Sequence, residues 1–361
     1  MQVAVSVIDE LSRLPDCSDD LTILASDEVH ADLQLLGSDL SRFSDYQIFN
    51  TYGLSAIWSG LGEKLRGHHV VFTLFGPLYL RSVLSVSIVG FAQAWIIYPD
   101  NEAYRSFSAF RRFTSRLKFF VQALIFKRAD RLVVELQHVK DQLVGRKVAE
   151  ARQVDVVHNG LSSVYLHAEK WKPLQTPIVK TRFSIGFVGR DYAHKNTGVF
   201  PQIKKLLHDL HDIDVDFYVT FNATEWAATT EFFRASVNNI GVLYSAQCPT
   251  FYQHMDAVIF PSVLECFSAT PLEALAMEKP LFASDRGFVR DVCADYAWYF
   301  DPENPAEAAD LIATYISKHL GHDGVRLAAA RQHVIQFSSA RQRAMDYLKL
   351  MQTVATERMA A

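Results

Sequence analysis

The sequence is poor in glycine and cysteine. Glycine accounts for 16 of the 361 residues, about 4% against a usual share of about 7%. Phenylalanine, by contrast, is abundant, with 25 residues. The four cysteines lie far apart, without CxxC or Cys/His metal-ligand spacing, so we expect a reducing compartment, no disulfide framework and no metal site. The formal net charge of −4 argues against a general nucleic-acid binder. Apolar residues at 49% and charged residues at 21% argue against disorder, collagen and coiled coil.

The sequence also lacks the pattern of a secretory signal peptide. Asp9 and Glu10 appear early, with no basic segment before them. The 18 uncharged residues 82–99 reach the length threshold for a spanning helix. They include several serines, Gln93 and a closing Pro99, so we interpret the segment as a buried strand followed by a loop.

Short apolar segments alternate with helix-length segments along most of the chain, as in a parallel sheet covered by helices on both faces. In the first half we expect strands at residues 21–25, 46–49, 70–74, 86–91, 132–134 and 154–157. In the second half we expect strands at 184–188, 215–220, 240–244, 257–260 and 281–283, and a helix at 201–210. Beyond residue 306 the sequence is almost wholly helical in character.

This pattern predicts an α/β protein with two tandem doubly wound, Rossmann-like domains. Residues 161–181 carry two prolines and several lysines and are typical of a linker. We therefore place a first domain at 1–165 and a second at 166–340. A helix over 341–361 would cross back to the first domain.

The first residues carry two conflicting patterns. Val3, Val5 and Val7 alternate as in a strand, whereas Val7, Leu11 and Leu14 follow helical spacing. We favour the helix. A Rossmann-type domain normally opens on a strand and a Gly-rich turn, so the chain would then begin one element into its domain.

The most informative segment is DAVIFPSVLECFSATPLEALAMEKPLFASD, residues 256–285. A strand leads into a loop, and Thr270, Pro271 and Glu273 have the pattern of a helix start, with an N-cap, a first helical residue and a reciprocal cap. Glu265 follows the strand at the edge where open α/β sheets bind ligands. Glu273 could equally be only half of a capping box, and Glu265 only a solvated loop acid.

A second informative segment is SIGFVGRDYAHKN, residues 184–196. Its strand ends in Gly189, and Arg190 and Lys195 follow in the loop. Two cations there suit a diphosphate, with Arg as a fork and Lys as a point charge. Such a pair taken alone is more often two solvated loop cations. Both segments end at the same edge of one predicted sheet, where together they would form a nucleotide-sugar site.

The second half resembles the C-terminal domain of a GT-B glycosyltransferase of retaining family 4, over about residues 154–320. Glu265 and Glu273 match the family's E-x7-E motif. The family's VGR…K loop and its Asn-Gly before the linker are matched at 188–195 and 159–160. Cys266 and Ser268 replace the two glycines of the usual Gly-Phe-Gly, which reduces backbone freedom but keeps the N–H donors.

The resemblance implies a role for each matching residue. Arg190 and Lys195 would hold the donor's diphosphate and stabilise the leaving nucleoside diphosphate. Glu265 would bind hydroxyls of the donor sugar near the reacting carbon, and Glu273 would accept hydrogen bonds from the ribose. The other donor-binding residues would be Gly189, Phe267, Ser268, Ala269 and Thr270. No metal and no cofactor beyond the nucleotide sugar is implied.

Two features bear on the acceptor side. Where the family often has a histidine, this chain has Gln93. It is either a neutral stand-in that can hydrogen-bond but cannot act as a base or, as we favour, a core or loop amide. Residues 103–128 contain seven basic residues, seven aromatic residues and no acid. Either this segment contacts an anionic membrane surface, or its aromatic residues are core and its cations a solvated face. Single-stranded RNA would suit the same chemistry, but no RNA-binding signature supports it.

Together these features predict a retaining, metal-independent hexosyltransferase. It would move a hexosyl or deoxyhexosyl group, mannose or rhamnose, from a nucleoside-diphosphate sugar, with GDP favoured, to a glycan or lipid-linked acceptor. The setting would be O-antigen (lipopolysaccharide) synthesis, with the protein cytoplasmic and peripheral at the inner face of the membrane. Two alternatives stay open: a GT-B nucleotide-sugar epimerase, and a non-catalytic nucleotide-sugar-binding subunit. The expected absence of a first strand and Gly-rich loop favours the latter.

Overall fold

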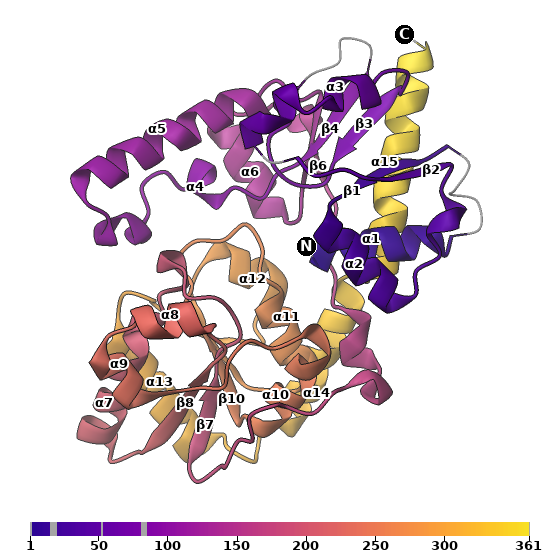
Figure 1. Ribbon diagram of the computed structural model, residues 1–361. Coiled ribbons are helices and arrows are strands. Elements are labelled where there is room, and N and C mark those ends of the chain that lie inside the picture. Colours follow the sequence, from indigo (N-terminus) through magenta and orange to yellow (C-terminus); the bar gives the residue numbers. More distant parts are fainter. Residues whose placement is uncertain (1, 15–19, 52, 81–84, 361) are drawn as a thin grey trace. The chain divides into compact units, whose positions relative to one another are not determined.

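The structure is a computed structural model that describes residues 2–14, 20–51, 53–80 and 85–360 (Figure 1). The chain forms two compact units. Unit 1 comprises residues 1–97, 113–160 and 338–361, and unit 2 comprises residues 98–112 and 161–337. The main chain therefore leaves unit 1 and returns to it twice.

Residues 98–112 were predicted in the first domain but group with unit 2. The cause is a set of long-range contacts that no local pattern reveals. Glu102 accepts a hydrogen bond from Arg286 at 3.0 Å, and Arg105 pairs with Glu303. The predicted boundaries at residues 165 and 340 compare with divisions after 160 and 337 in the structure.

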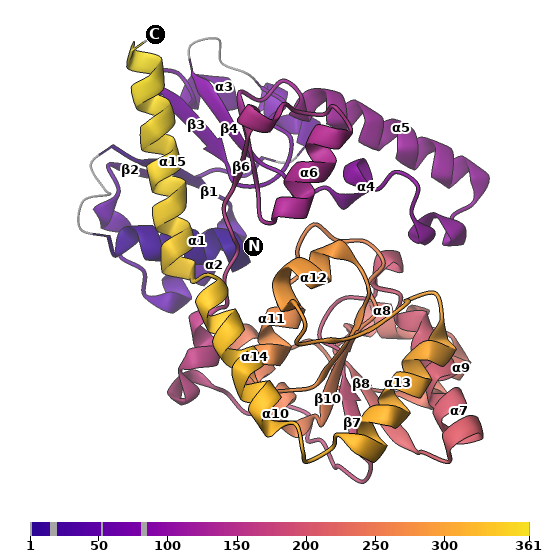
Figure 2. The ribbon, with the colours of Figure 1, turned by 180° about the vertical axis from the view of Figure 1, so that it is seen from behind.

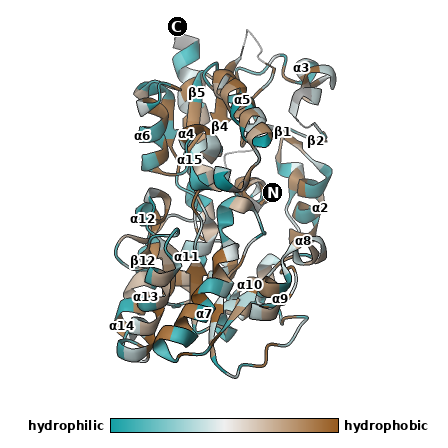
Figure 3. Cartoon of the chain, turned by 90° about the vertical axis from the view of Figure 1, so that its left-hand side faces the viewer, coloured by the Kyte–Doolittle hydropathy of each residue, from teal (hydrophilic) through white to brown (hydrophobic). Residues whose placement is uncertain are grey.

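Unit 1 contains two parallel sheets. A two-stranded sheet pairs β1 (Thr22–Ala25) with β2 (Asp45–Ile48). A four-stranded sheet has the order β3-β4-β5-β6, with strands at Val70–Thr73, Val86–Gly90, Arg131–Val134 and Val154–Val156. Strands β4 and β5 are mostly buried, as their continuous apolar character predicts, and they are among the hydrophobic segments in Figure 3.

The following helices belong to unit 1, except that residues 109–112 group with unit 2. They are α1 (Gln2–Ser12), α2 (Asp27–Leu36), α3 (Leu61–Lys64), α4 (Ala94–Ile97), α5 (Ala109–Phe126), α6 (Gln137–Gly145) and α15 (Ala340–Ala360). The predicted helix at the first residues is confirmed as α1. Its buried Val5 and Leu11 share a core with Tyr347 and Val354 of α15, which runs beside α1 and β3 (Figure 2).

Unit 2 is built on one parallel six-stranded sheet of order β12-β11-β10-β7-β8-β9. The strands span β7 (Phe183–Gly186), β8 (Val215–Val219), β9 (Val237–Asn239), β10 (Ala257–Phe260), β11 (Leu281–Ser284) and β12 (Trp298–Phe300). Residues in the four central strands are almost all fully buried, because helices pack on both faces. The predicted doubly wound α/β architecture is confirmed.

The helices of unit 2 follow the strands in alternation. They are α7 (Phe200–His211), α8 (Ala223–Ala228), α9 (Glu231–Ser236), α10 (Cys248–His254), α11 (Ala269–Ala276), α12 (Gly287–Cys293), α13 (Pro305–Lys318) and α14 (Gly324–Phe337). Phe187, Phe200 and Phe217 form part of the core between the sheet and α7, with no solvent exposure. The predicted helical character beyond residue 306 is confirmed by α13, α14 and α15.

One predicted strand is wrong. The apolar residues 240–244 form no strand. The edge strand that follows β8 lies earlier in the chain, at β9. Gly241 takes a left-handed backbone conformation with φ of +82°, which ends the extended run. The Asn239 side chain accepts hydrogen bonds from the backbone N–H groups of Phe221 and Gly241 at 2.9 and 3.2 Å. Strand β12 was not predicted.

The uncharged segment 82–99 contains β4 and then α4, separated by a short loop. Its residues 82–84 lie outside the described residues. Within the described part of the chain, no helix is both long enough and apolar enough to cross a membrane.

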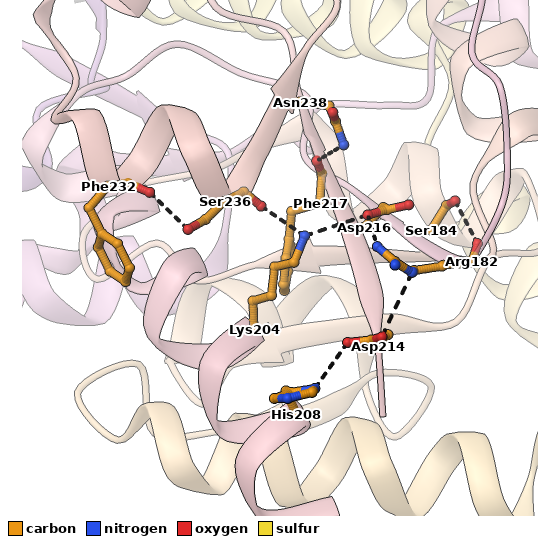
Figure 4. A network of polar contacts seen from close by, with 10 residues as sticks. All are labelled: Arg182, Ser184, Lys204, His208, Asp214, Asp216, Phe217, Phe232, Ser236 and Asn238. Carbon is orange, nitrogen blue, oxygen red and sulfur yellow. Dashed lines mark hydrogen bonds and ion pairs between the residues drawn. The ribbon is translucent and has the colours of Figure 1, made fainter. Parts of the chain in front are cut away.

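The amino ends of β7 and β8 carry a polar network (Figure 4). Asp216 lies 3.5 Å from Lys204 of α7 and 3.8 Å from Arg182, which precedes β7. Asp214 lies 3.2 Å from His208 of α7. These contacts tie two strands and one helix together at the edge opposite to the predicted site.

Candidate functional site

The two informative segments meet at the carboxyl edge of the sheet in unit 2. Strands β7 and β10 are direct parallel neighbours, so their following loops start side by side. The N–H of Val263 donates to the carbonyl of His194 at 2.9 Å. The Thr270 hydroxyl donates to the carbonyl of Val188 at 3.2 Å. The loops are therefore fixed to one another by hydrogen bonds.

Lys195 and Glu265 form a close ion pair at this edge. The Lys195 Nζ lies 2.5 Å from the Glu265 Oε1, and both side chains are only 13–14% exposed. The Ser262 hydroxyl donates to the same oxygen at 3.2 Å. Lys195 ends a short 3₁₀ turn, and Asn196 after it anchors the loop by donating to the carbonyl of Pro302 at 2.8 Å. A lysine and a carboxylate, both predicted site residues, are thus held together.

His194 is a third group at the pair, and the sequence prediction missed it. Its Nε2 lies 3.7 Å from the Glu265 Oε1, and its ring stacks on Tyr192 at 5.6 Å between centroids. Burial lowers the pKa of His194, the charge of Glu265 raises it, and that of Lys195 lowers it further. The imidazole is therefore neutral at pH 7. Its position directly before Lys195 was the available signal.

Arg190 is paired with an acid that the sequence prediction also missed. Its Nε donates to the Glu225 Oε1 at 2.6 Å, and this hydrogen bond raises the pKa of Arg190. Glu225 also completes a capping box with Asn222 at the start of α8, so its carboxylate is held in place. The N-x-x-E pattern of residues 222–225 indicates a helix cap, but it does not indicate that Glu225 contacts Arg190.

Gly189 lies where the backbone passes close to a buried ring. Its N–H donates to the Thr220 hydroxyl oxygen at 3.1 Å. A Cβ at this position would lie 3.0 Å from the ring of Phe187, so a side chain would require that core ring to move. The predicted donor-site glycine therefore also has a packing reason.

Helix α11 does not start as predicted. It begins at Ala269 after Ser268, so Thr270 lies inside the first turn and is not the N-cap. The Thr270 hydroxyl donates its hydrogen bond to the carbonyl of Val188 instead. Among the described residues, no side chain caps the helix, which leaves its first N–H groups available to an anion. The predicted donor residues Phe267, Ser268 and Ala269 are only partly buried there.

Glu273 is therefore not half of a capping box, and it lies among aromatic hydroxyls. The Tyr252 hydroxyl donates to its Oε2 at 3.0 Å, and Tyr165 and Cys248 lie beside it. Burial raises the pKa of Glu273, and the Tyr252 hydrogen bond lowers it in part. Burial, with the Glu273 charge, raises the pKa of Cys248 to about 12, so this thiol is not a nucleophile at neutral pH.

The predicted residue of the acceptor side, Gln93, lies in a loop. Gln93 lies in unit 1 between β4 and α4, partly exposed, and its carbonyl accepts from the N–H of Ile96 at 3.0 Å, as a loop residue does. Within the described ranges, no group of three or more His, Cys, Asp or Glu side chains is placed to hold a metal ion.

The second half of the chain is similar to a known protein family. Residues 174–330 match the family described as Glycosyl transferases group 1. This region of the chain is therefore similar to group 1 glycosyltransferases. The matched range includes both loops of the carboxyl edge and all of the predicted donor-site residues.

One curated relative is the O-antigen chain mannosyltransferase RfbU of Salmonella typhimurium (strain LT2). The two are 22% identical over 199 residues, which cover 51% of this chain and 50% of RfbU. The chain thus spans about half the length of the curated relative that it matches.

Solved structures resemble the chain over nearly its full length. A glycosyltransferase from Rickettsia africae superposes with a TM-score of 0.67 at 16% identity, covering 98% of this chain and 94% of that one. HepE of Anabaena, solved in complex with UDP and glucose, gives 0.66 at 14% identity, covering 98% and 96%. The predicted GT-B fold and the resemblance to GT-B glycosyltransferases are confirmed.

Proposed function

We propose that the protein is a retaining, metal-independent hexosyltransferase. It moves a hexosyl or deoxyhexosyl group from a nucleoside-diphosphate sugar to a hydroxyl of a glycan or lipid-linked acceptor. The observation that carries the proposal is the Lys195–Glu265 pair at the carboxyl edge of a group 1 glycosyltransferase domain. Nucleotide ligands bind at this edge in parallel α/β sheets.

The residues at the edge divide the work by charge. The donor's diphosphate competes with Glu225 and Glu265 for the cations Arg190 and Lys195, and it takes N–H groups at the start of α11. Drawn partly away from Lys195, Glu265 accepts hydrogen bonds from donor-sugar hydroxyls. Glu273 accepts from the ribose.

The reaction exchanges one bond for another on the same face of the sugar. The bond between the anomeric carbon and the phosphate oxygen breaks, and the acceptor oxygen bonds to that carbon. The leaving phosphate takes the acceptor's proton. Arg190 and Lys195 stabilise the negative charge that develops on the phosphate, which is the larger part of the expected catalysis.

The donor proposed is a GDP-linked mannose or rhamnose, and the product belongs to O-antigen synthesis. The support is the relative RfbU, which is an O-antigen chain mannosyltransferase. HepE is described with UDP and with UDP-glucose, so uridine donors belong in any test. We place the protein in the cytoplasm, peripheral at the inner face of the membrane, with contact through residues 103–128.

A thermal-shift screen with UDP-, GDP-, dTDP- and CMP-sugars tests donor binding, because a ligand that binds only the folded state raises the melting temperature. The stabilising donor is then incubated with and without a lipid-linked glycan acceptor. Transfer with retained anomeric configuration is expected. An epimer formed without acceptor would assign the protein to the epimerases. Binding with neither transfer nor hydrolysis would make it a binding subunit.

A further inference from the structure

Helix α5 has an apolar side that is largely exposed to solvent. Its inner side is packed, with Phe126 at 1% exposure and Phe119 stacked on Trp95 at 5.6 Å between ring centroids. The opposite side carries what we call the α5 stripe, six residues that are 47–78% exposed: Phe110, Phe113, Leu117, Phe120, Val121 and Leu124. At about 100° per residue, the six fall within an arc of about 100°, so they form one continuous stripe.

Cations border the α5 stripe on both sides. On the same helical wheel, Arg111 and Lys118 lie along one border, and Arg116 and Lys127 along the other. All four are exposed, and Figure 3 shows hydrophobic and hydrophilic residues side by side along α5. Such a helix suits a membrane interface, where apolar side chains enter the acyl region and long cationic side chains reach back to the headgroups.

We propose that the α5 stripe docks the protein on an anionic lipid bilayer. A second copy of the chain is a poorer occupant, because pairing two stripes would bring their bordering cations together. The segment 103–128 itself contains no Asp or Glu to offset this repulsion. A plane of anionic headgroups supplies countercharges along both borders at once. The inference rests on the proposed function only for the side of the membrane, since lipid binding requires neither donor nor acceptor.

Sedimentation of the full chain with lipid vesicles tests the apolar part of the proposal. Wild-type protein is expected to bind phosphatidylcholine vesicles that contain one-third phosphatidylglycerol. The double variant Phe113→Ser/Phe120→Ser is expected to lose this binding. The matched control is Leu35→Ser/Leu36→Ser, which removes two apolar residues of α2 that are 86% and 56% exposed, and it is expected to bind as wild type.

The same assay tests the electrostatic part. Vesicles of phosphatidylcholine alone are expected to bind the wild-type chain far more weakly. The variant Arg116→Gln/Lys118→Gln is expected to bind anionic vesicles about thirty-fold more weakly at low salt, at about five-fold for each cation. Added salt is expected to reduce wild-type binding and to narrow the difference in affinity between the wild type and Arg116→Gln/Lys118→Gln.

Three results would overturn the proposal. The first is no binding of folded wild-type protein to anionic vesicles. The second is equal binding by both α5 double variants and the wild type. The third is a dimer in sedimentation equilibrium that Phe113→Ser/Phe120→Ser abolishes while lipid binding is absent, which would assign the stripe to a second copy. Circular-dichroism melting checks that each variant is folded. No donor is present, so failure here leaves the transfer reaction untouched, and a chain without transfer activity can still bind vesicles.

Discussion

The two edges of the sheet in unit 2 both carry ion pairs, but the pairs differ in what they connect. At the amino edge, Asp216 is shared between Lys204 and Arg182 at 3.5 and 3.8 Å, and the contacts tie strands to a helix. At the carboxyl edge, each acid holds its own cation, with 2.5 Å between Lys195 and Glu265. Lys195, Glu265 and Arg190 lie in the segments that follow strands, whereas Glu225 lies in the first turn of α8. The carboxyl edge therefore presents two cations, each with its own acid, where parallel α/β sheets bind ligands.

The strongest way to sharpen this contrast is to remove the carboxylate of the loop pair. Glu265→Ala is expected to lower the turnover number about 100-fold or more, since contacts that strengthen in the transition state carry rate enhancements of that size. Donor affinity is expected to fall only a few-fold. Steady-state kinetics and calorimetric donor titration measure the two effects. A loss of donor affinity with turnover unchanged would assign Glu265 to ground-state binding alone.

The second change removes the cation of the same pair. Lys195→Met is expected to weaken binding of the nucleoside diphosphate about ten-fold or more, because it deletes a charged hydrogen bond. Binding of the unphosphorylated nucleoside serves as the internal control and is expected to be unchanged. If both ligands lose affinity alike, the lysine supports the loop and does not contact phosphate.

The third change concerns Glu273, whose pKa is raised by burial. Between the unfolded and the raised folded pKa, the folded state binds more protons, so stability falls as the pH rises through that window. Glu273→Gln removes the buried charge and keeps an acceptor for the Tyr252 hydroxyl. We expect a higher melting temperature than wild type at pH 7, a difference that shrinks as the pH falls towards the unfolded pKa, and weaker donor binding. A lower melting temperature at pH 7 would contradict the burial argument.

The smallest effect is expected at the amino edge. Arg182 is half exposed, and its contacts with Asp214 and Asp216 are 3.9 and 3.8 Å long. Arg182→Ala is expected to change the free energy of unfolding by less than about 1 kcal/mol and to leave turnover unchanged. Urea denaturation and the transfer assay check both. A loss of activity without a loss of stability would remove the distinction between the edges.

Local sequence patterns predicted the elements of the fold well where burial is continuous. Strand β10 spans the predicted residues 257–260, four consecutive apolar residues that are all fully buried in a sheet covered on both faces. The strand predicted at 240–244 failed because Gly241 and the side chain of Asn239 turn the backbone. Apolar character alone does not reveal such a turn.

The candidate site was predictable as residue types but not as pairs. Arg190 and Glu225 lie 35 positions apart and meet only because β7 and β8 are neighbours in the sheet. The spacing of Thr270, Pro271 and Glu273 suggested a helix cap. In the structure the Thr270 hydroxyl donates instead to the carbonyl of Val188 in the neighbouring loop. The order of the strands decides which carboxylate pairs with which cation. Local sequence motifs do not predict that order.

The packing of α15 against α1 has a consequence for the order in which a ribosome-bound chain can fold. Unit 1 draws its core from both ends of the chain, with Val5 beside Tyr347 and Val354. The long segment 161–337 of unit 2 emerges from the ribosome earlier than α15 does. The part of the apolar face of α1 that packs on α15 therefore gains this contact only after residues 161–337 have been synthesised. Until then, only the contacts of α1 with nearby elements such as α2 can bury its apolar side chains.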